Sequence, residues 1–416
     1  MDLQTNPVNE LLYISFNQDC TCFVCGTEAG FRVYSSDPFR LTHRRDFDNG
    51  GGLGVIAMLF RTNILAFAGG GYQPRFQPHK VVLWDDRQRR VVAELAFRSA
   101  VRAVRLRRDL IVVALDRKVY VYGFRDLTLY DSIETVNNKG LCCLSVGTGR
   151  TALVCQGMQK GHALVVFYPR GFGESRAPQA REKTMIIPAH ESGIAAMAID
   201  YNGSLLATAS EKGTIVRIFD TSTGTKLQEL RRGADQAEIH SLAFSPAVDW
   251  LVVSSDKGTV HVFSVQAMGA SIGSDGGPEN SKSTLRRLRG VLPVYFSSEW
   301  SFAQFRVQDY RCIAAFGAEA NTIIIVCGNG QYYKVRFDPV RGGEMVREEF
   351  IEFHDGVAPR ERPAEETSET SEAGQSNPEK VTRGPSTFAL RHPGFASATD
   401  KIDTLDDEPD AGAKPA

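Results

Sequence analysis

Two adjacent arginines, Arg231 and Arg232, are the residues of this chain best suited to bind an anion. They follow a segment with the pattern of a β-strand, 226–230, and Gly233 ends it. Successive side chains of an extended strand point to opposite faces, so each arginine is expected to face a separate neighbourhood. The planar guanidinium group matches the spacing of phosphate oxygens. The dipeptide therefore predicts two anion sites at the edge of a sheet, unless it is an ordinary solvated surface pair.

A short pattern recurs along the chain: a small or polar turn, then an alternating strand that ends in an aromatic residue. The final aromatics are Tyr34, Trp84, Tyr122, Phe167, Phe219, Phe263 and Phe337. They lie 50, 38, 45, 52, 44 and 74 residues apart, and all intervals except the last match the length of a four-stranded propeller blade. We therefore expect an all-β fold, a seven-bladed β-propeller whose short strands stack radially into one core.

The clearest repeat has a regular internal order. Four alternating segments, 194–199, 205–210, 215–220 and 226–231, are separated by glycine-containing turns. We expect them to be the strands of one blade from the inside outward, with the arginine pair at the end of the outer strand. The next repeat continues this order with 239–244, 251–255 and 259–265.

The propeller is expected to span residues 1–354, with a long loop, 266–290, between the third and outer strands of the sixth blade. Loops longer than ~15 residues in a compact domain are usually functional or disordered. Leu285, Leu288 and Leu292 recur at a spacing of three to four residues with arginines between them. This spacing fits a basic amphipathic segment that inserts into an anionic membrane surface. It fits equally a solvated loop whose leucines pack back on the propeller.

Charge is distributed unevenly along the chain. Residues 355–416 contain 13 acidic and 7 basic residues, net −6, whereas residues 1–354 carry a net charge of +5. The acidic segment is rich in Pro, Glu, Ser, Thr and Ala, so we expect a disordered acidic tail. The mildly basic body fits an anionic partner but has no basic stripe of the kind that binds nucleic acid.

Metal, membrane-spanning and enzymatic functions find little support. Cys20, Cys22 and Cys25 lack a fourth ligand at a spacing suited to zinc, and the scattered cysteines are typical of reduced, buried thiols in the cytosol. There is no signal-peptide pattern and no apolar run near the ~20 residues that span a bilayer, so any membrane contact is expected to be peripheral. We find no nucleophile elbow, phosphate-binding glycine loop or metal-ligand set, and expect no enzymatic activity, metal or cofactor.

Several segments together resemble the PROPPIN family, the phosphoinositide-binding seven-bladed WD-repeat propellers of autophagy. They are Leu230-Arg231-Arg232-Gly233, Phe296-Ser297-Ser298-Glu299-Trp300-Ser301-Phe302-Ala303, and Asn17-Gln18-Asp19 followed by Gly30-Phe31-Arg32-Val33-Tyr34. Leu230 departs from the phenylalanine often present at the first position of the arginine motif. The stretch from Gly69 to Asp86 is most similar to the shorter-chain branch of the family. The resemblance covers residues 8–354 and does not extend to the tail.

The resemblance implies recognition of phosphatidylinositol 3-phosphate and phosphatidylinositol 3,5-bisphosphate at two rim sites. By position, the first site would use Arg231 with His190, Thr208, Ser210 and Arg217. The second would use Arg232 with Ser254, Ser255, Thr259 and His261. Hydroxyl, imidazole and guanidinium groups are the donors that a phosphomonoester requires, although serines and threonines at strand ends often only cap turns.

The same resemblance implies that the edge around Asn17 and Asp19 binds an autophagy-related lipid-transfer protein. The expected function is a peripheral membrane scaffold in autophagy or in vacuolar or endosomal traffic. The protein would be cytoplasmic and recruited to vacuolar, endosomal or pre-autophagosomal membranes. The alternative is a protein-binding propeller without a direct lipid role, which would need neither the arginine pair nor the leucine-containing loop.

Overall fold

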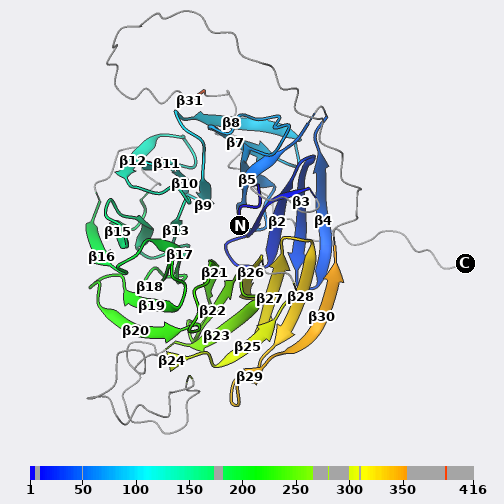
Figure 1. Ribbon diagram of the computed structural model, residues 1–416. Coiled ribbons are helices and arrows are strands. Elements are labelled where there is room, and N and C mark those ends of the chain that lie inside the picture. Colours follow the sequence, from blue (N-terminus) through cyan, green and yellow to red (C-terminus); the bar gives the residue numbers. More distant parts are fainter. Residues whose placement is uncertain are drawn as a thin grey trace, which may run out of the picture.

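The strands of the computed structural model form seven sheets around a central axis, and Figure 1 shows the ring end on. The structure describes residues 1–4, 10–48, 50–172, 181–265, 280, 299–308, 311–353 and 389–390. The innermost strand of each sheet contacts the innermost strands of both neighbouring sheets, which closes the circle. The predicted all-β, seven-bladed propeller is therefore confirmed.

Each blade is a four-stranded antiparallel sheet in which consecutive strands pair from the axis outward. The first four blades comprise β1 (Leu11–Phe16), β2 (Cys22–Thr27), β3 (Gly30–Ser36) and β4 (Phe39–Asp46); β5 (Leu53–Met58), β6 (Ile64–Gly69), β7 (Lys80–Asp85) and β8 (Arg90–Ala96); β9 (Ala103–Leu106), β10 (Leu110–Ala114), β11 (Lys118–Gly123) and β12 (Leu129–Glu134); and β13 (Cys142–Leu144), β14 (Thr151–Gln156), β15 (His162–Tyr168) and β16 (Lys183–Pro188). The last three comprise β17 (Ile194–Ile199), β18 (Leu205–Ser210), β19 (Ile215–Asp220) and β20 (Lys226–Arg231); β21 (Ile239–Phe244), β22 (Trp250–Ser255), β23 (Thr259–Ser264) and β25 (Ala303–Arg306); and β26 (Cys312–Phe316), β27 (Thr322–Cys327), β28 (Gln331–Arg336) and β30 (Val346–Glu352).

Three short strands extend the outer edges of blades. β24 (Glu299–Trp300) pairs in parallel with β20, and β29 (Gly343–Glu344) pairs in parallel with β25. β31 (Ala389–Leu390) pairs antiparallel with β8. Each addition gives backbone partners to an edge that would otherwise present unpaired groups. Apart from β31, residues 354–416 lie outside the described part, so the disordered tail remains a prediction.

The sequence repeats correspond to specific strands. The seven aromatic-ended segments contribute the third strand of each blade, namely β3, β7, β11, β15, β19, β23 and β28. The four segments predicted for the clearest blade are β17 to β20 with the predicted bounds. β23 pairs with its outer partner β25, and the chain between them includes the predicted loop 266–290, of which the structure describes only Asn280. Leu285, Leu288 and Leu292 lie outside the described residues.

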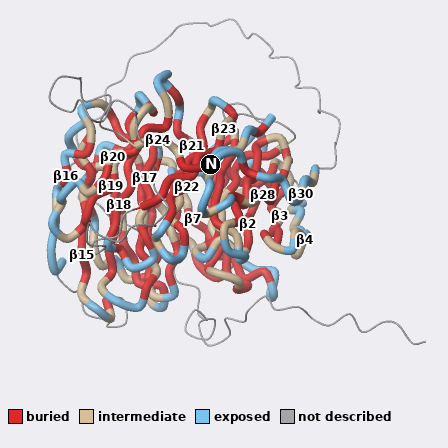
Figure 2. Tube along the Cα trace, turned by 90° about the horizontal axis from the view of Figure 1, so that it is seen from below, coloured by how far each residue is buried: buried red, intermediate tan, exposed pale blue. Residues whose placement is uncertain are grey.

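The hydrophobic core consists of the layers between adjacent blades, and each strand contributes alternate side chains to the layer on either side. In the fifth blade, Leu206 and Phe219 pack toward the fourth blade, in a cluster that contains Phe167 of β15. Ala209 and Val216 pack toward the sixth blade instead. Figure 2 shows buried residues concentrated along inner strands such as β17, β18 and β22. The period of two along a strand therefore decides which neighbouring blade a side chain faces.

The ring closes between the first and seventh blades without a shared strand in the described part. The hydroxyl of Tyr332 on β28 donates to the backbone carbonyl of Ser36 over 2.6 Å. Lys334 forms a 2.9 Å ion pair with Asp37, and the Phe39 ring packs against Tyr332. Side-chain contacts thus hold the two ends of the ring together. Within the described residues, no helix is long and apolar enough to cross a membrane.

Candidate functional site

The arginine pair lies at the outer end of the fifth blade, where β20 ends. Arg231 stands opposite Ile215 of β19, and its backbone neighbours Trp300 of β24. The Arg232 amide donates to the Thr214 carbonyl over 2.9 Å. Alternation along the strand directs Arg231 toward the fourth blade and Arg232 toward the sixth. Both side chains are buried, at 6% and 7% exposure, so the pair is not a solvated surface pair.

The four predicted partners of Arg231 lie on the same side of the fifth blade. Thr208 on β18 and Arg217 on β19 are directly opposite each other, and Ser210 follows two residues after Thr208. The His190 Nε2 atom is 3.0 Å from the Thr208 hydroxyl. We call this group, with Arg231, the first pocket.

Charge in the first pocket is partly neutralised by Glu229. Arg217 Nε donates to the Glu229 carboxylate over 2.9 Å, and a second guanidinium nitrogen donates to the Ala189 carbonyl over 2.7 Å. Burial favours the neutral form of Glu229, but the hydrogen bond and charge of Arg217, with Lys226, outweigh burial and lower its pKa. An incoming anion must therefore compete with Glu229 for Arg217. Our sequence reasoning missed Glu229, although its position two residues before Arg231 places both on one strand face.

His190 is held in its neutral form. Burial, and then the positive charge of Arg217, lower the pKa of His190 to about 4. At neutral pH the imidazole is therefore a polar group rather than a cation. A phosphate placed beside it would favour the charged form.

The second pocket lies on the opposite side of β20, facing the sixth blade. Arg232 Nε donates to the Gly213 carbonyl over 3.0 Å, and another guanidinium nitrogen donates to the Asp235 carbonyl. Burial lowers the pKa of Arg232, against the raising effect of the Asp256 and Asp235 carboxylates. No carboxylate of the described residues forms an ion pair with this guanidinium group. The second pocket is thus less neutralised than the first.

His261 is the closest counterpart of Arg217 in the sixth blade. It occupies the third position of β23, and Thr259 lies two residues earlier on the same face. Burial, and then the charge of Arg232, lower its pKa to about 4. Its Nδ1 atom is buried and has no hydrogen-bond partner in the part of the chain that the structure describes. An anion that accepts this hydrogen bond would satisfy a polar atom that is otherwise buried without one.

The two adjacent serines of β22 face opposite blades. Ser255, like Ser210 of β18, stands opposite the first residue of the innermost strand of its own blade. Ser254 points away, toward the seventh blade, and its hydroxyl donates to the Cys312 carbonyl over 2.8 Å and contacts Ser241 at 2.7 Å. The structure therefore brings Ser255, Thr259 and His261 together with Arg232, and places Ser254 outside the second pocket.

The predicted partner-binding turn has one structural and one exposed residue. The Asn17 side chain is 5% exposed; it donates to the Thr21 hydroxyl over 3.2 Å and accepts from the Cys22 amide over 3.1 Å. Asp19 is exposed and accepts a 2.6 Å hydrogen bond from the Thr21 hydroxyl. Asn17 therefore shapes the turn, and Asp19 is the residue available to a partner.

The insertion between β23 and β24 is anchored beside the arginine pair. Asn280 is buried; its side chain accepts from the Ser264 amide over 2.6 Å and donates to the Ser264 carbonyl over 2.7 Å. It also donates to Glu299 over 2.9 Å, and Gln228 of β20 donates to the same carboxylate over 2.7 Å. Sequence patterns did not predict this network, because it joins residues distant in the chain.

Known proteins are similar to this chain in sequence and in fold. Residues 10–286 match the PROPPIN family. Autophagy-related protein 18e of Arabidopsis thaliana is 39% identical over 83% of this chain and 88% of its own length, and SVP1-like protein 2 of Pichia angusta is 40% identical over 71% and 81%. Among solved structures, Kluyveromyces lactis Hsv2 has a TM-score of 0.63 at 23% identity over 82% of this chain and 98% of its own. A complex of KlAtg21 with the coiled coil of AgAtg16 has a TM-score of 0.61 at 21% identity over 83% and 99%. This chain belongs to the PROPPIN family.

Proposed function

We propose that this protein is a peripheral membrane scaffold that recognises phosphatidylinositol 3-phosphate and phosphatidylinositol 3,5-bisphosphate through the first and second pockets. Family membership supports a phosphoinositide-binding scaffold of autophagy that is not an enzyme. The choice of these two lipids and pockets is the proposal. We expect the protein at vacuolar, endosomal or pre-autophagosomal membranes.

One observation carries the assignment of the pockets. Two consecutive arginines are both buried, and each lies with its own histidine and hydroxyl groups on a different face of β20. Burying a guanidinium group is costly unless an anion or hydrogen-bond acceptors compensate it. Hydrogen bonds to the Gly213 and Asp235 carbonyls compensate part of the burial of Arg232, but a protein-binding scaffold without a lipid role does not need two adjacent cations that each face a histidine and hydroxyl groups. Phosphomonoesters accept hydrogen bonds from every type of donor present.

Liposome flotation with Arg231→Thr/Arg232→Thr tests the proposal. We expect binding to liposomes with either 3-phosphoinositide to fall to background. Each single change should weaken binding about 10²-fold, because two sites on one rigid body gain through effective concentration. Arg117→Thr/Arg125→Thr, two exposed arginines of the third blade, removes the same charge as a control.

The two arginines lie at the end of β20, and both side chains are buried. Replacing Arg232 also removes hydrogen bonds to two backbone carbonyls. The thermal midpoint of each variant must therefore be measured beside flotation. Unchanged flotation of the folded double variant would refute the proposal and favour a scaffold that binds only proteins.

We further propose that the segment with Leu285, Leu288 and Leu292 inserts into the membrane. Partial burial of three leucines and attraction of the intervening arginines to anionic lipid would contribute roughly 3–5 kcal/mol, or several hundredfold in apparent affinity. Replacing the three leucines by serine should sharply reduce liposome binding and leave binding of soluble headgroups unchanged. If both assays fall together, the leucines instead pack on the sixth blade.

A protein partner is proposed at the first blade. KlAtg21, a structural neighbour, has been solved with the coiled coil of AgAtg16, which supports partner docking on this fold. We propose that an autophagy-related lipid-transfer protein contacts this turn. Asn17 holds the turn in shape, and Asp19 is its exposed residue. Asp19→Ala should reduce partner capture and lower the thermal midpoint less than Asn17→Ala does, because Asp19 is exposed and bonds only within the turn, to Thr21. Equal capture by wild type and Asp19→Ala would contradict this assignment.

A further inference from the structure

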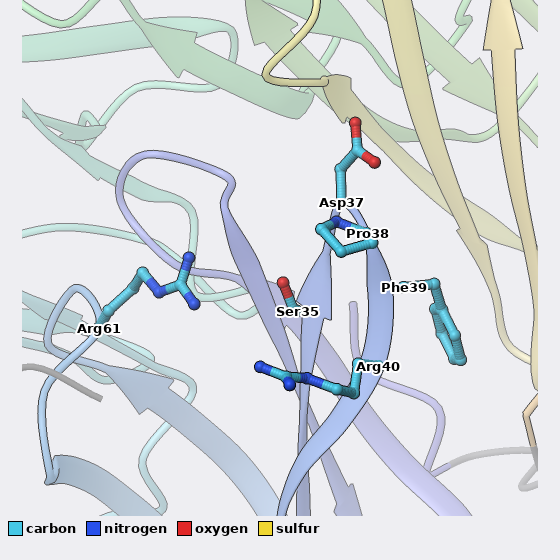
Figure 3. A pocket seen from close by; sticks show the side chains of 6 residues that line it. All are labelled: Ser35, Asp37, Pro38, Phe39, Arg40 and Arg61. Atoms are coloured by element: carbon cyan, nitrogen blue, oxygen red, sulfur yellow. The ribbon is translucent and has the colours of Figure 1, made fainter. Parts of the chain in front are cut away.

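A cationic cavity lies at the first and second blades, outside both pockets of the arginine pair. It has a volume of about 330 Å³ and is lined by Ser35, Asp37, Pro38, Phe39, Arg40 and Arg61. Figure 3 shows Arg61 pointing toward Ser35 from one side and the Arg40 guanidinium group below Ser35, with Asp37 and Phe39 directed elsewhere. Two guanidinium groups and a hydroxyl line the cavity, and groups of both kinds are donors suited to an oxyanion.

The strand register explains why these donors meet. Ser35 of β3 stands opposite both Cys22 of β2 and Arg40 of β4, so the three side chains share the face toward the second blade. Arg61 comes from the turn between β5 and β6 of that blade. Its positive charge acts on the Cys22 thiol, opposing the rise in pKa that burial causes there. The cavity therefore receives one arginine, Arg40, from the first blade and a second, Arg61, from the second blade.

The cavity has unsatisfied capacity for an anion. The Nε atom of Arg61 is buried and has no hydrogen-bond partner within the described residues. The lining carboxylate, Asp37, is engaged by Lys334 of the seventh blade over 2.9 Å, so it is already compensated from the opposite side. A bound carboxylate or phosphate would supply an acceptor for this Arg61 Nε atom.

The described part of the seventh blade ends beside this cavity, and acidic residues follow in the sequence. Phe353, where the described part of the seventh blade ends, packs against Phe39 of the cavity wall with ring centroids 5.9 Å apart. Residues 355–372 follow immediately and contain six acidic residues and two arginines. The acidic positions are Asp355, Glu361, Glu365, Glu366, Glu369 and Glu372.

We propose that the Arg40–Arg61 cavity is an anion site that binds the carboxylates of the chain's own acidic segment, residues 355–372. The acidic positions Glu361 to Glu372 lie 8 to 19 residues after Phe353, and a random-coil chain of that length has a root-mean-square span of roughly 15–25 Å, enough to reach a cavity beside its attachment point. Such a tether gives an effective concentration in the millimolar range, on the order needed to hold a weak ion-paired contact. An acidic segment of a partner protein would have to displace the tail. The inference is independent of lipid recognition, because neither arginine belongs to the first or second pocket.

A peptide-competition experiment on the full-length chain tests the proposal. The probe is a fluorescent synthetic peptide of residues 355–372, and its affinity is measured by fluorescence polarisation. In the tail-neutral variant, the five glutamates of this segment are replaced by glutamine within the full chain. We expect the wild-type protein to bind the peptide at least about threefold more weakly than the tail-neutral variant, because the tethered segment competes. Equal affinities would overturn the proposal, and this comparison leaves the propeller unchanged.

Two further arms locate the site and the ligand chemistry. Arg40→Gln/Arg61→Gln in the tail-neutral chain should weaken peptide binding at least tenfold, whereas Arg117→Gln/Arg125→Gln should leave it unchanged. Equal binding by these two variants would overturn the location. Inositol 1,3-bisphosphate should not displace the peptide. Displacement would mean that the cavity selects phosphate, and would overturn the assignment to an acidic segment.

Discussion

The neutral histidines beside the two arginines predict a specific sensitivity to acid. His190 and His261 both have a folded-state pKa of about 4, against an ordinary value of 6.5. Between these values the unfolded chain binds protons that the folded chain does not, so the free energy of unfolding must fall as pH is lowered. The loss begins near pH 6.5 and is complete below about pH 4. At pH 5.0 each imidazole contributes a loss of about 2 kcal/mol relative to pH 7.5, or about 4 kcal/mol for both.

A double difference isolates this effect from all other titrating groups. Urea unfolding of the wild type and of His190→Gln/His261→Gln is measured at pH 7.5 and pH 5.0. The wild type should lose about 4 kcal/mol more than the double variant, since the remaining acid-sensitive groups are common to both proteins. His162→Gln, at the first position of β15 and partly exposed, serves as the matched control and should behave as the wild type. An equal loss in wild type and double variant would refute the neutral, buried state of these imidazoles.

Three other predictions follow from individual contacts. Glu229→Gln should release Arg217 from its ion pair. The affinity of the first pocket for inositol 1,3-bisphosphate, measured by calorimetry, should then rise about three- to tenfold. A decrease in affinity would show that Glu229 positions Arg217 instead. Ser254→Ala should lower the free energy of unfolding by about 1–2 kcal/mol without changing headgroup affinity, because the Ser254 hydroxyl donates to the Cys312 carbonyl. A loss of headgroup affinity as large as that of Ser255→Ala would contradict the observed orientation of Ser254. Asn280→Ala should lower the free energy of unfolding by about 1–3 kcal/mol and speed hydrogen exchange at the Ser264 amide. Unchanged exchange would show that the hydrogen bond between Asn280 and Ser264 is dispensable.

The residues around the second pocket show which side-chain orientations strand alternation predicts from the sequence. Alternation along a strand correctly predicts that Arg231 and Arg232 face opposite sides of β20. The same rule applies to Ser254 and Ser255, and only one of these neighbours can face Arg232. Sequence reasoning assigned both to one pocket. The structure places Ser254 toward the seventh blade, where its hydroxyl donates to the Cys312 carbonyl of that blade and contacts the Ser241 hydroxyl of its own blade.

The sequence alone determined the all-β class, the seven blades, the strands of the fifth blade and the opposite orientation of the two arginines. These features depend on backbone geometry within a few residues: a period of two along strands, and glycine at tight turns. The tertiary structure alone decided that the arginines are buried, that Glu229 neutralises Arg217, and that Asn280 anchors the insertion. It also brought Phe353 of the last blade against Phe39 of the first. Such contacts depend on how blades stack around a closed ring, and no local periodicity encodes the distance between residues more than 300 positions apart.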